Sequence, residues 1–109
     1  MNTADRLRQL KAITDLMRDR DLSRLSLASL QKAKIEALLG SLDKTHSAPG
    51  LDPIVAAQVV DRFGLWTTNR RILLNQQLSR ATADWLGARA DAQRSFGRAE
   101  VVDKLTSKR

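Results

Sequence analysis

Side chains that commonly carry chemistry are few in this chain, and their spacing does not suit catalysis. His46 is the only histidine, and no second ligand or base is spaced to act with it, so we interpret it as a solvated turn residue. Asp84 and Asp91 lie among arginines and, like Asp19 and Asp21, fit exposed helix charge better than an acid and base pair. The chain has no cysteine and no phosphate loop, nucleophile elbow or two-histidine zinc helix. We therefore expect a protein that is not an enzyme and that binds neither metal nor cofactor.

Tryptophan and arginine often anchor protein interfaces, which makes four positions of interest. Trp66 and Trp85 fall on an apolar stripe, so packing between helices is the leading interpretation and exposure to a partner is the alternative. Arg70 and Arg71 form the densest basic spot. A solvated face is favoured there over contact with phosphate or an acidic surface, and no neighbouring aromatic is placed to stack a base.

These residues must be positioned by two long helical patterns that one breaker cluster separates. Pro49, Gly50 and Pro53 lie within five residues, and nothing in the sequence indicates a strand. Asp52 can cap a new helix whose first residue is Pro53. The sequence predicts an all-α fold of two long helices in an antiparallel coiled-coil hairpin, with helices over about 3–42 and 53–104 and a turn over about 43–52.

The first helix is expected to begin with Thr3 as its cap. Its buried stripe is expected to follow steps of three and four residues through Leu7, Leu10, Ile13 and Met17, and to resume after a charged segment at Leu25, Ala28, Ile35, Leu38 and Leu42. The charged segment 18–21 contains neither glycine nor proline. We therefore expect the helix to continue through it, with local weakening as the alternative.

The second helix is expected to pack its stripe against the first. The seam residues that we predict there are Phe63, Trp66, Leu74, Leu78, Trp85 and Phe96. Gly64, Gly87 and Gly97 each cost a helix interior about 1 kcal/mol, so this helix should depend on tertiary contacts. Because it is the longer helix, we expect it to extend past the first, with residues 96–109 as the overhanging part.

Length and composition suit one small domain that acts through association. The 109 residues are 42% hydrophobic with four aromatic side chains, which is thin for a globular core, so a partner or a second copy should complete the burial. The net charge of +7 favours acidic partners, although it is scattered along the chain. No leader or apolar span is evident, and the cytoplasm is the expected location.

In outline the chain resembles the FliJ family, the small basic helical-hairpin proteins of flagellar and related type III export. The likeness lies in the basic charge, the absent cysteine, the central turn, the leucine-rich start and the arginine- and alanine-rich segment 88–99. The resemblance implies a cytoplasmic stalk whose terminal ends enter the ring of the export ATPase, while its body meets the export gate and substrate chaperones. The residues offered to the ring would be Arg98, Lys104, Lys108 and Arg109.

Two other functions remain open at the level of sequence. The same positive charge would suit a small helical protein associated with DNA or RNA, for which steep salt dependence of binding is the signature. Alternatively, two hairpins could bury their stripes together as a homodimeric four-helix bundle that serves as a scaffold.

Overall fold

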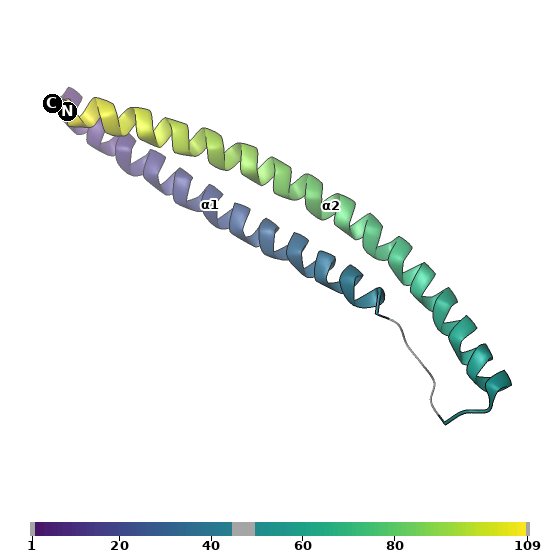
Figure 1. Ribbon diagram of the computed structural model, residues 1–109. Coiled ribbons are helices and arrows are strands. Elements are labelled where there is room, and N and C mark those ends of the chain that lie inside the picture. Colours follow the sequence, from purple (N-terminus) through teal and green to yellow (C-terminus); the bar gives the residue numbers. More distant parts are fainter. Residues whose placement is uncertain (1, 45–49, 109) are drawn as a thin grey trace. The chain divides into compact units, whose positions relative to one another are not determined.

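The structure is a computed structural model that describes residues 2–44 and 50–108. It consists of two long helices, α1 (Thr3–Leu42) and α2 (Pro53–Ser107), which run antiparallel (Figure 1). The described residues contain no strand, so the predicted all-α hairpin is confirmed. Both helices are continuous, α1 through the charged segment 18–21 and α2 through its three glycines. The predicted turn falls partly outside the described residues, and so does His46.

Side-chain caps fix where both helices begin. Asp52 accepts a hydrogen bond from the Ile54 amide through its carboxylate (2.9 Å), as expected for a residue that precedes the first turn of α2. At the start of α1 the cap is Asn2 and not Thr3, because the Asn2 side-chain oxygen accepts the Asp5 amide (2.8 Å). An amide oxygen reaches these free N–H groups as well as a hydroxyl does, so the cap lies one residue earlier than predicted, while the helix itself spans the predicted residues Thr3–Leu42.

A strict seven-residue repeat defines the inward face of each helix. In α1 every residue of two such series is buried or half-buried; these are Leu7, Thr14, Asp21, Ala28, Ile35 and Leu42, and Ala4, Lys11, Arg18, Leu25, Lys32 and Leu39. The corresponding series in α2 are Thr67, Leu74, Ala81, Ala88, Ser95 and Val102, and Arg71, Leu78, Trp85, Ala92, Ala99 and Thr106. We call these inward faces the seam. A repeat of seven is the signature of coiled-coil packing.

The contacts divide the chain into two units. Unit 2 comprises residues 31–81, and its core is apolar: Ile35, Leu74 and Ala81 are buried, and Leu39, Leu42 and Leu78 pack against them. Unit 1 comprises residues 1–30 and 82–109, and it pairs the two ends of the chain (Figure 1). Its buried residues on α2 are small, namely Ala92, Ser95, Ala99 and Val102.

The segment of α2 that extends past α1 is at the opposite end from the one we expected. In unit 1, Lys11 near the start of α1 forms an ion pair with Asp103 near the end of α2 (3.2 Å), so this end of α2 is paired with α1 rather than overhanging. In unit 2, Arg71 forms an ion pair with Asp43, just past the end of α1 (2.8 Å). The residues of α2 before Arg71 therefore continue beyond the last turn of α1. We call residues 53–70 the overhang.

Candidate interaction surfaces

A buried polar contact lies at the centre of the unit 1 seam. The Ser95 hydroxyl donates a hydrogen bond to the Asp21 carboxylate, and both residues are buried. The Arg20 guanidinium also donates to Asp21 (3.1 Å), and Arg24 lies 3.9 Å away. The Ser95 hydrogen bond, followed by that from Arg20, lowers the pKa of Asp21, although burial acts in the opposite direction. Asp21 is therefore a carboxylate that its surroundings keep ionised.

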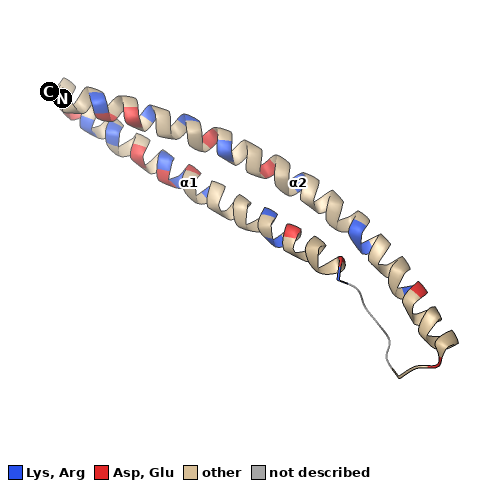
Figure 2. Cartoon of the chain, in the orientation of Figure 1, with Lys and Arg blue, Asp and Glu red and all other residues tan. Residues whose placement is uncertain are grey.

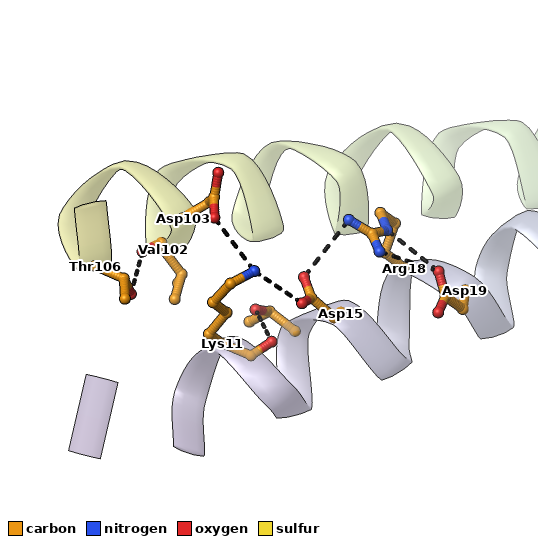
Figure 3. A network of polar contacts seen from close by, with 8 residues as sticks. Lys11, Asp15, Arg18, Asp19, Val102, Asp103 and Thr106 are labelled. Carbon is orange, nitrogen blue, oxygen red and sulfur yellow. Dashed lines mark hydrogen bonds and ion pairs between the residues drawn. The ribbon is translucent and has the colours of Figure 1, made fainter. Parts of the chain in front are cut away.

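A second polar network links the helices nearer the chain ends (Figure 3). The Lys11 ammonium lies between two carboxylates, Asp15 on its own helix (3.0 Å) and Asp103 on α2 (3.2 Å). These partners, Asp15 first, raise the pKa of Lys11. Arg18 extends the network through Asp15 (3.5 Å) and Asp19 (3.2 Å). Charged groups thus occupy seam positions that a coiled coil usually fills with apolar side chains.

Large apolar side chains lie on the outside of unit 1, where the seam does not cover them. On α1 the exposed ones are Leu10, Ile13, Leu16, Leu22, Leu27 and Leu30. Leu22 lies on another side of the helix, and we call the other five, Leu10, Ile13, Leu16, Leu27 and Leu30, the outer stripe. Leu16 is 69% exposed and Leu27 67%. These residues recur at steps of three with a gap of eleven residues, which keeps them on one side of the helix. Exposed apolar side chains that gather on one side of a helix commonly mark a site of protein interaction.

A shallow hollow in unit 1 gathers three arginines. It has a volume of about 240 Å³ and is lined by Met17, Arg20, Asp21, Asp91, Arg94, Ser95 and Arg98. Arg94 forms an ion pair with Asp91, and Arg20 with Asp21. Arg98 forms no ion pair among the described residues. The hollow can therefore offer one guanidinium to a carboxylate from outside, while its other arginines are already engaged.

The basic residues predicted to bind partners are distributed over both units. In unit 1, Arg98 and Lys108 are exposed, and Lys104 forms an ion pair with Glu100 (3.5 Å). Arg109 lies outside the described residues. In unit 2, Arg70 and Arg71 are half-buried, and Arg71 bonds Asp43, so Arg71 serves the helix pair as well as offering charge.

The predicted seam residues have different surroundings. Leu74 is 1% exposed, and Leu78 packs against the same core. Trp85 is half-buried at a seam position, with the Arg89 guanidinium 5.5 Å from the centre of its ring. Two aromatic side chains are exposed instead of lying in the seam, Trp66 at 53% and Phe96 at 55%.

The physical reason is geometric in both cases. Ser95 takes the inward position next to Phe96, because the repeat of seven that passes through Leu74 and Ala81 reaches 95 and not 96. Trp66 lies in the overhang, where α1 has already ended. Phe63 is half-buried, and its ring centre lies 5.6 Å from that of Trp66.

The polar seam and the outer stripe were both missed by the sequence analysis. We expected Leu10 and Ile13 to be buried because they are apolar, yet they are exposed, and Lys11 and Thr14 occupy the inward face. A test for an exact seven-residue repeat that counts back from Ile35 would have found Thr14 and Asp21. The described residues contain no group of three side chains suited to hold a metal ion.

Neither helix has a segment, among the described residues, that is long and apolar enough to cross a membrane. Comparison of the chain with protein-family models, with curated proteins and with solved structures gives no match.

Proposed function

We propose that this chain is a non-enzymatic coiled-coil interaction protein that acts in the cytoplasm as a FliJ-like stalk of flagellar or related type III export. In this proposal unit 1, which contains both ends of the chain, enters the ring of the export ATPase and promotes assembly of the ring. Unit 2 is left to meet other components, such as the export gate or substrate chaperones.

The outer stripe is the observation that carries the proposal. Exposure of the outer-stripe side chains to water is unfavourable, and their burial by a partner would release that free energy. A ring that surrounds unit 1 would bury them, and the polar seam inside unit 1 would hold the two helices together without using those side chains. The paired ends replace the single overhanging helix that we expected to be offered to the ring.

Charge supports the same partner. Arg98 and Lys108 are exposed and form no ion pair among the described residues, and both belong to unit 1, Arg98 within α2 and Lys108 just past its end. An acidic inner surface of a ring would therefore be attracted to this end of the chain. Such attraction mainly accelerates association and weakens as salt is added.

The test is a binding and activity assay with the purified export ATPase of the same bacterium. We expect the full chain to be retained by the ATPase, to promote its assembly into rings and to raise its rate of hydrolysis. Replacing Leu16 and Leu27 by glutamate should abolish these effects, because charge on the outer stripe opposes burial. Replacing Leu38, an exposed leucine of α1 in unit 2, by glutamate is the matched control and should leave them intact.

Absence of binding, together with unchanged hydrolysis and assembly, would exclude the stalk. If the variant changed at Leu16 and Leu27 still binds, as the Leu38 variant should, then the outer stripe is not the contact surface. Circular dichroism of each variant must show the helical content of the unmodified chain, so that loss of binding is not loss of folding.

A further inference from the structure

The hollow of unit 1 holds one more arginine than its own carboxylates neutralise. Arg20 forms an ion pair with Asp21 (3.1 Å), and Arg94 forms one with Asp91. The third arginine of the hollow, Arg98, is exposed, and no ion pair joins it within the described part of the chain. Elsewhere in unit 1, basic and acidic residues alternate along both helices (Figure 2). The hollow therefore presents a guanidinium that is placed to bind one carboxylate from outside.

Exposed apolar side chains lie on the same side of unit 1 as the hollow. Because both helices keep a repeat of seven, residues seven positions apart point to the same side. Four residues that line the hollow have a large apolar counterpart seven positions nearer the chain ends. The counterparts are Leu10, Ile13, Val101 and Leu105, which correspond in turn to Met17, Arg20, Arg94 and Arg98. All four counterparts are exposed. We call them the apolar platform; its two members on α1 also belong to the outer stripe.

The platform and the hollow fit a third helix that lies along the pair. They are one repeat apart, which is a distance of about 10 Å along a helix. A helix packed beside α1 and α2 covers that distance in seven of its own residues, so an apolar residue over the platform and an acidic residue in the hollow lie on one face of it. An extended segment would cover the same distance in about three residues, whose side chains point to opposite faces. The spacing therefore favours a helical occupant.

We infer that this side of unit 1 binds a helix of a partner protein that carries apolar residues and, seven positions along the same face, a glutamate or aspartate. The carboxylate enters the hollow and accepts hydrogen bonds from Arg98, while the apolar residues cover the platform. The inference rests on the proposed function in that unit 1 is the part that meets a partner, and it adds the chemistry which that partner must carry.

The composition of this side favours a protein over a nucleic acid. A phosphate could bind Arg98, but Asp21 and Asp91 line the same hollow and would repel a chain of phosphates. None of the residues that line the hollow is aromatic, so no ring there can stack on a base. The platform offers a nucleic acid no charge, whereas it offers the apolar face of a helix a surface to cover.

The first test titrates the full chain with a synthetic peptide of about 20 residues, stapled so that it stays helical in water. The peptide carries leucines at the inward positions of one repeat and a glutamate at an inward position of the next. We expect saturable binding, and replacing that glutamate by glutamine should weaken it about tenfold, because a charge-assisted hydrogen bond is lost. Arg98→Gln should weaken binding of the glutamate peptide by a similar factor and remove the difference between the two peptides.

The matched control for this titration is Arg80→Gln. It removes the same charge from an exposed arginine of α2 in unit 2, so both affinities should stay as they are. The inference is overturned if the glutamate peptide does not bind, if the unmodified chain binds both peptides equally, or if Arg98→Gln keeps the preference for glutamate. The export ATPase takes no part in this titration, so the proposed stalk and the helix site can each fail alone.

The second test examines the platform with the same glutamate peptide. Val101→Glu should abolish binding, because it places a charge where an apolar contact is required. Leu86→Glu is the control: Leu86 is also exposed in unit 1, but the repeat of seven places it on another side of α2. Both residues are exposed, so circular dichroism should show the helical content of the unmodified chain in each variant. Loss of binding in both variants, or in neither, contradicts a contact through the platform.

Two further measurements examine the other possible occupants. The unmodified chain, Arg98→Gln and Val101→Glu are each titrated with duplex and single-stranded DNA, and each is sedimented alone over a range of concentrations. We expect no DNA binding and no self-association that depends on Arg98 or Val101. A DNA complex or a dimer that both substitutions abolish would identify a nucleic acid or a second copy as the occupant and overturn the inference.

Discussion

The hydroxyl of Ser95 donates a hydrogen bond to the carboxylate of Asp21, and this contact joins two helices across 74 positions of sequence. Both residues occupy the seven-residue repeat of their helix, where Ile35 and Leu74 stand in unit 2. A buried polar pair contributes less to stability than a well-packed apolar pair. Its usual value in a coiled coil is that it disfavours other registers, since any shift leaves the carboxylate without its donor.

The pH dependence of stability should reveal Asp21. Its folded-state pKa lies below the ordinary value of 3.8, so the unfolded chain takes up the proton first as the pH falls. The contribution of Asp21 is therefore complete at higher pH, begins to decline near pH 4 to 5 and is lost once the pH passes below the folded-state pKa. Urea unfolding between pH 7 and pH 3 should show a larger loss of stability for the unmodified chain than for Asp21→Asn. Parallel curves would show that Asp21 is not stabilised in its ionised form.

Substitutions at Asp21 and Ser95 should show whether this polar pair contributes to stability, to the register of helix pairing, or to both. Ser95→Ala should lower the melting temperature by several degrees, because it removes a donor from a buried carboxylate. Ser79→Ala, which removes an exposed serine that bonds only the Asn75 carbonyl (3.1 Å), is the control and should have little effect. The double change Asp21→Leu with Ser95→Ala should restore or raise the melting temperature while doubling amide resonances in the NMR spectrum, as alternative registers become populated. A single set of resonances in the double variant would mean that only one register is populated, and that Asp21 and Ser95 are not needed to select it.

The core of unit 2 should respond strongly to a cavity. Leu74 is the most deeply buried large side chain of the described residues and contacts the cluster of Ile35 and Ala81. Leu74→Ala should reduce the free energy of unfolding by about 3 kcal/mol. The adjacent Leu73 is exposed, and Leu73→Ala should change the free energy of unfolding by less than about 1 kcal/mol. Urea titrations of the two variants provide the comparison, and equal losses would mean that the seam does not pass through Leu74.

The hairpin could be predicted because its strongest signals are local. Asp52 before Pro53 marks a helix start through hydrogen bonding and a fixed φ, whatever the tertiary structure. In unit 2 the buried positions of the repeat are filled by apolar residues, so the apolar stripe expected from the sequence placed Leu74 and Leu78 correctly.

Unit 1 was harder to predict because its seam does not follow the usual relation between polarity and burial. Lys11, Thr14 and Asp21 point inward while Leu10 and Ile13 point outward, so an analysis that assigns apolar residues to the inside selects the wrong face. The overhang was misplaced for a related reason. Helix lengths alone do not say at which end the longer helix extends, and the ion pair of Lys11 with Asp103 supplies that information.

Two glycines should respond to alanine with opposite signs. Gly87 lies within α2, and a Cβ built there meets no heavy atom within 4 Å, so Gly87→Ala should raise the free energy of unfolding by about 0.5–1 kcal/mol through helix propensity. Gly50 precedes the start of α2 with a φ of 83°, and there too a Cβ would have room. Its backbone lies in a region that alanine rarely adopts, so Gly50→Ala should lower the free energy of unfolding by about 1 kcal/mol.

Because neither substitution creates a clash, the difference in sign isolates backbone conformation from packing. Urea unfolding of the two variants and the unmodified chain, at one protein concentration so that self-association is held constant, measures both effects. Stabilisation by alanine at position 50 would show that the left-handed conformation is not retained in solution. Destabilisation at position 87 would show that the added methyl group meets a neighbour, either within unit 1 or in a second copy.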